Sequence, residues 1–277
     1  MTEAIPTDRI FSLSCFEGVR LFRLYQNTHP ELDIPDLLAL IENVEADAHN
    51  LDLEASVHLS MIVDQECPLE GVAFYQGCIK AVLLKHQPIW SKLMRAGRKR
   101  FINSLGENDH DIFEAAGLMK EPPSSSLVEW WDNVSGYARL IIDQIKMEQA
   151  RKAEIMTIEY ERKKLAKVGI DKEVEWPGFD DNFAGYDVLS YDKIESGIVA
   201  RMIEVKSTIS SPLRFILTRN EWDKAKNSMD SYIFHIWDMS TVSPVLYIRT
   251  ANEISLHIPN DHEKGEWKTA LVPVGGN

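Results

Sequence analysis

The stretch that decides the fold reads Val-Ala-Arg-Met-Ile-Glu-Val-Lys at residues 199–206, and Tyr-Asp-Val-Leu-Ser-Tyr precedes it at residues 186–191. Both runs are short, rich in β-branched and aromatic residues, and bounded by turn-forming residues. They predict two neighbouring strands, joined by a loop over residues 192–197.

The alternation of side chains along these strands places charged residues together on one face. Side chains on a strand point to opposite faces in turn, so Glu204 and Lys206 lie on one side and Val205 faces the core. If the first strand pairs beside the second, Asp187 joins them there. Two carboxylates, substrate phosphate oxygens and water suit an octahedral Mg²⁺ ion. A neighbouring lysine can position or deprotonate an attacking water and stabilise charge on a phosphate.

The elements that follow extend the mixed pattern. Further strands are predicted over residues 213–217, 232–237 and 245–249. Thr218, followed three residues later by Glu221, has the form of a capping box and predicts a short helix after the third strand. Strands and helices in this order predict an α+β fold, an α/β sandwich.

The first half of the chain reads as helical. Asp33 and Pro35 predict a helix start, and Pro88 is expected to break a helix. Apolar residues recur at helical spacing over residues 9–26, 37–44, 51–63 and 69–105.

A domain boundary is predicted at residues 121–126, Glu-Pro-Pro-Ser-Ser-Ser, because prolines stop a helix and serines favour turns and caps. The predicted organisation is an all-helical N-terminal domain over 1–121, a long connecting helix over 127–168 and a mixed domain over 150–277. A chain of 277 residues suits about two domains.

The charge balance limits how the chain could act on nucleic acid. It carries 43 acidic and 30 basic residues, a net charge of −13, and residues 1–120 hold 18 of the acids and 11 of the bases. Affinity for duplexes comes mainly from Lys and Arg neutralising phosphates, so metal ions or a partner protein would have to supply much of the attraction.

Several classes of protein are disfavoured. Cys15, Cys67 and Cys78 form no C-x-x-C pair, so neither a disulfide framework nor a zinc knuckle is expected. No phosphate-binding or dinucleotide glycine motif occurs, so no nucleotide cofactor is predicted. No apolar run is long enough for a membrane span and the N-terminus is unlike a signal peptide, so we expect a cytoplasmic protein without membrane contact.

Five ordered blocks of sequence resemble a known family, "protein NO VEIN C-terminal", over about residues 150–240. The acidic residue followed by Glu-x-Lys also resembles the PD-(D/E)xK nuclease superfamily, whose fold is the restriction endonuclease-like core. The blocks are Ala153-Glu154, Tyr160-Glu161, Gly185 to Ser190, Ile203 to Thr208, and Phe215 with Asn220-Glu221-Trp222.

The resemblance implies roles for particular residues. Asp187 and Glu204 would be ligands of Mg²⁺ or Mn²⁺ with the Val205 carbonyl as a third, Lys206 would be the catalytic lysine, and Glu154 would add an acidic group. Two departures from the family pattern stand out, Ala153 in place of the usual glycine and a loop at 192–197 longer than the usual tight turn. Neither removes a chemical group.

Each candidate also has a structural interpretation. Glu204 and Lys206 could form a cross-strand pair, and Asp187 could cap a turn. Glu159 and Glu161 are alternatives to Glu154 on the same predicted helix.

Two groups of residues could contact nucleic acid. Asn220, Glu221 and Trp222 begin a predicted helix and could reach nucleic acid, or they could serve as its start and core anchor. The densest basic cluster of the N-terminal half could track phosphates or be a solvated helix face; it comprises Arg95, Arg98, Lys99 and Arg100.

The expected function is that of a Mg²⁺-dependent nuclease acting on DNA. The resemblance implies a setting in bacterial restriction or anti-phage defence, and a homo-oligomer or a partner protein of such a system is expected, since cutting both strands takes two active sites. The alternatives are a non-catalytic scaffold that keeps the fold, which the acidic N-terminal half favours, and cleavage of RNA.

Overall fold

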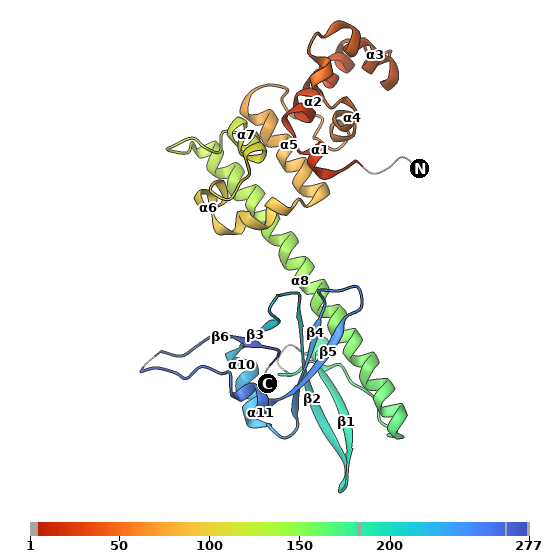
Figure 1. Cartoon of the computed structure of the whole chain (residues 1–277), viewed down its shortest axis with the longest axis vertical. Coiled ribbons are helices and arrows are strands. Elements are labelled where there is room, and N and C mark those ends of the chain that lie inside the picture. Colours follow the sequence, from red (N-terminus) through yellow and green to blue (C-terminus); the bar gives the residue numbers. More distant parts are fainter. Residues whose placement is uncertain (1–4, 182–183, 264, 276–277) are drawn as a thin grey trace. The chain divides into compact units, whose positions relative to one another are not determined.

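The computed structural model describes residues 5–181, 184–263 and 265–275, and the chain divides into two compact units (Figure 1). The first unit is Met1–Gln144 and the second is Ile145–Asn277. The division falls inside the long helix α8 (Ser125–Val168), which begins after the two prolines. No helix in the described parts of the chain is long and apolar enough to cross a membrane.

The first unit is helical, as predicted, and its core is rich in aromatic residues. Rings of Phe11, Trp90, Phe101 and Phe113 contact one another in tilted or edge-on arrangements at centroid distances of 4.8–6.4 Å. Its helices are α1 (Thr7–Ile10), α2 (Leu13–Thr28), α3 (Ile34–Val44), α4 (Leu53–Ser60), α5 (Gly71–His86), α6 (Arg98–Ile102), α7 (Glu107–Ala115), and the 3-10 segments Ala48–Asn50 and Ile89–Ala96.

Side-chain caps start three of these helices, α2, α3 and α4. Asp33 accepts a hydrogen bond from the Asp36 N–H and begins α3, and α5 ends just before Pro88, both as predicted. The helix expected over 9–26 is two helices, because Ser12 caps the second by accepting from the Cys15 N–H.

The second unit is built on a mixed sheet of four strands, so the α+β class is confirmed at this level. The strands are β1 (Val188–Ile194), β2 (Gly197–Thr208), β4 (Tyr232–Asp238) and β5 (Val245–Thr250), in the order β1-β2-β4-β5. Strands β2 and β4 are parallel, and the other pairs are antiparallel.

A second, two-stranded sheet was not foreseen. It pairs β3 (Arg214–Thr218) with β6 (Thr269–Pro273), strands that lie about fifty residues apart in the sequence. Helices α9 (Pro177–Asp180), α10 (Arg219–Asn227) and α11 (Ala251–Ser255) complete the unit. Helix α10 starts with the predicted capping box of Thr218 and Glu221.

The predicted loop over residues 192–197 is wrong. Strand β1 continues to Ile194 and β2 starts at Gly197, which leaves Glu195 and Ser196 as a two-residue turn. The polar residue Asp192 stays in the strand because its carboxylate pairs with Arg201 across the hairpin at 2.7 Å. The departure from the family's tight turn therefore disappears.

The two faces of the main sheet bury different cores. Helix α8 covers one face (Figure 1), with Ile158 and Leu165 packed against Val188 and Ile203. Aromatic and aliphatic residues of β4 and of α10, α11 and the small sheet fill the other face. Strand β2 is therefore buried on both sides, and its alternation sends Glu204 and Lys206 toward α10.

A buried polar cluster lies between α8 and the sheet. The Glu161 carboxylate accepts from Ser190 at 2.5 Å and pairs with Lys164 at 2.5 Å. His235, from β4, is fully buried with its Nε2 3.6 Å from Glu161, and neither ring nitrogen has a hydrogen-bond partner among the described residues. Burial lowers the pKa of His235 to about 3; the positive charge of Lys164 adds to the shift, and the negative charge of Asp192 opposes it.

His235 is expected to make stability depend on pH. An exposed histidine titrates near about 6.5. As the pH falls from about 6.5 toward 3, the unfolded chain gains a proton that the folded chain excludes, so the free energy of unfolding decreases by up to about 1.4 kcal/mol per pH unit. Chemical denaturation of His235→Phe should show a shallower dependence over that range. His257→Gln, at an exposed position, is the control and should keep the wild-type slope.

Candidate active site

Asp187 is fixed against β2 by its own side chain. Its N–H donates to the Ile203 carbonyl at 3.0 Å, and its Oδ2 accepts from the Val205 N–H at 2.7 Å. The carboxylate thus accepts the hydrogen bond that a backbone carbonyl would accept between paired strands. It extends the hydrogen bonding between β1 and β2 to the residue before β1 begins. This arrangement aims one edge of the carboxylate at β2 and fixes its position beside Glu204 and Lys206.

Close packing of the α9 turn holds Asp187 from the other side. The Gly178 N–H donates to the Asp187 carbonyl at 3.1 Å. A Cβ atom at position 178 would lie 2.9 Å from the Asp187 Cα and 3.0 Å from its Oδ1, so only glycine allows this approach.

Glu204 and Lys206 form a direct ion pair at the centre of the site. Lys206 Nζ lies 2.8 Å from Glu204 Oε1 and 2.9 Å from Glu221 Oε2. Glu204 is only 5% exposed, and its Oε2 accepts from the Tyr232 hydroxyl at 3.1 Å. The same hydroxyl also lies 2.8 Å from the Gly185 carbonyl. Glu204 is thus held by an ammonium and a phenol, one on each oxygen.

Burial shifts the proton affinities of these groups. It raises the pKa of Glu204 to about 8, although Lys206 opposes the shift. It also raises the pKa of Asp187 to about 6, against the Val205 N–H, while the charge of Glu154 adds to the rise. For Lys206, burial alone would lower the pKa, but attraction to Glu204 and Glu221 outweighs it and raises the pKa overall. The lysine is therefore a charged donor at neutral pH.

Glu154 lies beside this group on α8 and is held by its own partners. Its Oε2 accepts from Trp176 Nε1 at 2.8 Å and pairs with Arg151 at 2.8 Å. The Arg151 guanidinium stacks over the Trp176 and Phe179 rings at 4.9 and 5.1 Å.

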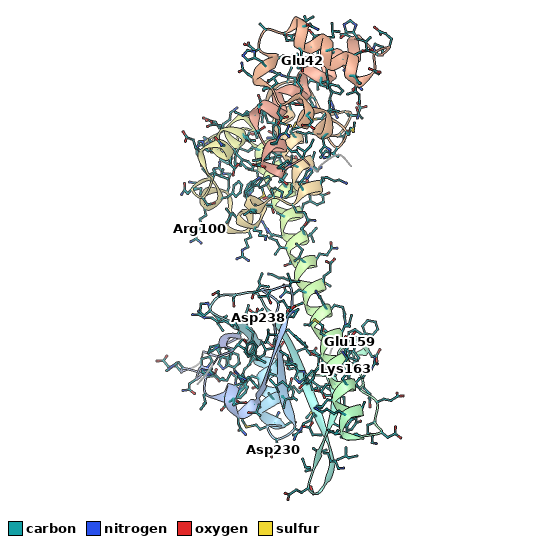
Figure 2. All side chains as sticks on the ribbon, turned by 45° about the vertical axis from the view of Figure 1, so that its right-hand side comes forward. Glu42, Arg100, Glu159, Lys163, Asp230 and Asp238 are labelled. Atoms are coloured by element: carbon teal, nitrogen blue, oxygen red, sulfur yellow. The ribbon has the colours of Figure 1, made fainter. Side chains whose placement is uncertain are left out.

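The two other acidic candidates on α8 lie elsewhere. Figure 2 shows Glu159 on the helix with Lys163, and both side chains are exposed. Glu161 is buried in the polar cluster under the opposite face of the sheet from Glu204. Of the three glutamates, Glu154 is the one whose charge acts on Asp187.

The donor set fits a divalent cation. Asp187, Glu204 and Glu221 place three carboxylates near the single ammonium of Lys206, an excess of acid. Burial is the main cause of the raised pKa values of Asp187 and Glu204, and the neighbouring carboxylates add to it. A hard oxygen-seeking ion such as Mg²⁺ would relieve that excess. Asp187 and Glu204 are the side chains that would hold it, with the Val205 carbonyl from the same strand.

The predicted nucleic-acid contacts are spread over both units. Asn220 is exposed in the first turn of α10, one residue before Glu221. The basic cluster belongs to the first unit, where Arg95 is exposed at the end of the 3-10 segment and Lys99 and Arg100 are exposed on α6 (Figure 2). Arg98 instead donates to the Leu118 carbonyl at 2.6 Å and pairs with Glu121, so it has a structural role.

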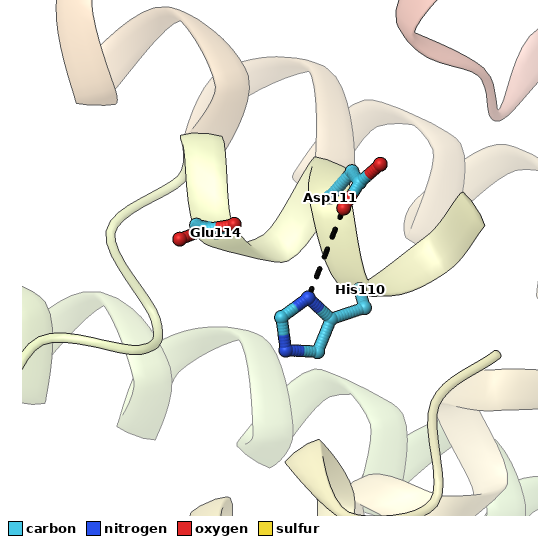
Figure 3. A group of neighbouring side chains, drawn as sticks. All are labelled: His110, Asp111 and Glu114. Atoms are coloured by element: carbon cyan, nitrogen blue, oxygen red, sulfur yellow. Dashed lines mark ion pairs between the residues drawn. The ribbon is translucent and has the colours of Figure 1, made fainter. Parts of the chain in front are cut away.

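A separate trio of potential metal ligands lies on α7 (Figure 3). One ligand atom each from His110, Asp111 and Glu114 lies within 4.8 Å of the others, and among the described residues this is the one such trio of side chains. Asp111 and Glu114 are exposed, and neighbouring charges on a solvated helix are common without any ion.

The sequence places Glu221 at a helix start or a nucleic-acid contact and not with Lys206, and it does not place Tyr232, Gly178 or Trp176 in the site. Glu221 carries a readable capping signal, and Pro177-Gly178 is a turn signal. Their second contacts join different elements: Glu221 of α10 contacts Lys206 of β2, fifteen residues earlier, and Gly178 of α9 packs on Asp187, nine residues later.

Comparison with known proteins gives one match. The family described as Protein NO VEIN, C-terminal matches residues 153–248, about a third of the chain. The matched range contains Glu154, Asp187, Glu204 and Lys206 and excludes all of the first unit. No curated protein and no solved structure matches the chain significantly.

Removing the ammonium of Lys206 should destabilise the fold, because Glu204 would then be buried without a cation. Lys206→Met keeps most of the apolar stem of the side chain but leaves Glu204 without its cation, so we expect a loss of about 3 kcal/mol in the free energy of unfolding. The loss should be smaller at about pH 6 than at about pH 9, because a carboxyl of raised pKa takes up a proton at the lower pH.

Urea unfolding of a double-mutant cycle checks this coupling. Adding Glu204→Gln to Lys206→Met should recover part of the loss, while Lys226→Met, at an exposed lysine on α10, should change stability by less than about 0.5 kcal/mol. Equal losses for Lys206→Met and Lys226→Met would show that the buried pair is not coupled.

Proposed function

We propose that the second unit is a metal-dependent nuclease of the PD-(D/E)xK type, with a restriction endonuclease-like core, that hydrolyses phosphodiester bonds in DNA. The observation that carries the proposal is the joining of Glu204, Lys206 and Asp187 on one side of β2, with Glu204 almost fully buried. Burying these charges is costly, and chemistry is a reason to keep them there. The resemblance further implies a role as effector of a bacterial restriction or anti-phage system, with a homo-oligomer or a partner protein.

The residues divide the work as follows. Asp187 and Glu204, with the Val205 carbonyl, would hold Mg²⁺ or Mn²⁺, which when bound supplies an activated water and polarises the phosphate. Lys206 keeps its proton, because two carboxylates raise its pKa, so it would donate to a phosphate oxygen and stabilise the charge that develops there. Removal of a proton from water by Lys206 is disfavoured.

Surrounding residues keep this lysine in place. Glu221, anchored by the cap of α10, is the second carboxylate that holds Lys206 Nζ, beside Glu204. Tyr232 fixes the other oxygen of Glu204. Arg151 holds Glu154 near Asp187 without neutralising Asp187 itself.

Cleavage assays with the full chain test the proposal. Supercoiled plasmid, single-stranded DNA and RNA are incubated with Mg²⁺, Mn²⁺ or EDTA. We expect metal-dependent cutting that Asp187→Asn lowers by about 100-fold or more, because the amide cannot replace a charged ligand. Glu159→Gln, an exposed acid on the outer side of α8, should cut like the wild type. Cutting of RNA alone would replace DNA as the substrate.

Metal binding gives a readout that does not require cleavage. Mn²⁺ must displace protons from Asp187 and Glu204, so its affinity should fall as the pH drops from about 8 to 6, and binding should release protons. Calorimetry in buffers of different ionisation enthalpy measures both effects, and Asp187→Asn should weaken binding. A metal affinity that is the same at both pH values, or unchanged in Asp187→Asn, contradicts the assignment.

A non-catalytic scaffold is the second candidate. Lys206 already has two carboxylate partners, so the cluster can stand as a structural lock without metal or substrate. A scaffold would neither cut nucleic acid nor bind Mn²⁺. It would still show the stability loss described for Lys206→Met. The absence of both activities from a folded wild-type chain would favour it.

A further inference from the structure

A groove of about 750 Å³ opens beside Lys206 within the second unit. One wall is the α8 segment with Gln149 and Ala150, the floor is the end of β2 and the residues after it, and the other wall is the small β3–β6 sheet. Gln149 donates to the Ser207 hydroxyl at 3.1 Å and so ties the helix to the floor. The volume lies in the range of sites that enclose part of a ligand.

The lining of this groove has basic residues and no acidic residue among those described, although the chain carries a net charge of −13. The basic residues are Lys146, Lys206 and Arg214, and Lys206 is already paired with Glu204 and Glu221. Three other pockets are each lined by at least two acidic residues. Arg214 is exposed, and its guanidinium makes no ion pair or hydrogen bond with the described residues. The groove therefore suits a polyanion.

The groove also carries an apolar strip that a duplex would not use. Ile209, Ile216 and Leu271 line it with 65%, 62% and 58% of their surfaces exposed. Ile216 and Leu271 are opposite each other in the register of β3 and β6, so they form a continuous apolar step. A duplex presents phosphates and hides the faces of its bases, whereas an unpaired strand presents both.

We propose that this groove binds an unpaired strand of nucleic acid next to the phosphate that is cut. Arg214 contacts a phosphate, and the apolar strip of Ile209, Ile216 and Leu271 supports bases or sugars. The proposal rests on the proposed function in that Lys206 lies at one end of the groove. It assigns single-stranded DNA or RNA, or a frayed end or flap of a duplex, as the substrate class.

Binding in EDTA tests the groove separately from cleavage. Fluorescence anisotropy is measured on the full chain with labelled oligonucleotides of about twelve residues, as single-stranded DNA, single-stranded RNA and duplex DNA. We expect either single strand to bind about tenfold or more tightly than the duplex. Arg214→Ala should weaken single-strand binding about fivefold and lower the slope of log affinity against log salt by about one.

The apolar strip should behave differently from Arg214. Ile216→Ser, on the exposed side of β3, should weaken single-strand binding about fivefold while leaving the salt slope unchanged, because no charge is lost. Lys193→Ala removes an exposed cation of β1 outside the groove and should bind as the wild type does.

Two results would overturn the groove as an unpaired-strand site. One is duplex binding as tight as single-strand binding. The other is an affinity in Arg214→Ala and Ile216→Ser within about twofold of the wild type. Displacement of the oligonucleotide by polyglutamate at equal charge would assign the groove to acidic peptides instead.

Cutting and binding together separate the two proposals. If Asp187→Asn no longer cuts but still binds single strands, both proposals are supported. If the wild type binds single strands but never cuts, only the nuclease is rejected.

Discussion

The buried carboxylate of Glu204 is the constraint around which the second unit is arranged. A carboxylate that is 5% exposed is tolerated only when cations and hydrogen-bond donors compensate for lost water. Here Lys206 and Tyr232 compensate for the lost water, and each can do so only from a particular position in the fold. Lys206 has to lie two residues further along the same strand, and Tyr232 has to start the parallel strand β4. The parallel pairing of β2 and β4 is therefore tied to the chemistry of one side chain.

The two faces of the sheet deal with buried polarity in different ways. On the α8 face, Lys164 and Ser190 both hold Oε2 of Glu161, while its Oε1 and the neutral His235 have no hydrogen-bond partner among the described residues. On the α10 face, acids outnumber the single lysine, and the pKa values of Asp187 and Glu204 rise. Glu161 and His235 are fully buried, whereas the second arrangement has acid left over beside Lys206. Only the second has the character of a site that accepts a cation.

Much of the fold could be predicted from local sequence signals. The rest depends on contacts between residues that are distant in the sequence and could not be predicted. The cap at Asp33 and the capping box of Thr218 and Glu221 were predicted correctly because each involves residues three positions apart. Strand β6 was missed because its partner β3 is remote in sequence. The hairpin turn was misjudged because Asp192 looks like a loop residue until its ion pair with Arg201 is seen. Likewise, no local pattern shows that Gly178 packs on Asp187 or that Tyr232 reaches Glu204.

Glu221 serves two structures with one atom. Its Oε2 accepts from the Thr218 N–H, which starts α10, and from Lys206 Nζ, which belongs to the candidate active site. Selection for a stable helix and selection for chemistry would therefore act on the same carboxylate. A descendant of this chain that abandoned the chemistry would still gain from keeping Glu221, while Lys206 and Asp187 would be free to drift. The fate of Lys206 and Asp187 in a lineage is thus a better record of its enzymatic history than the fate of Glu221.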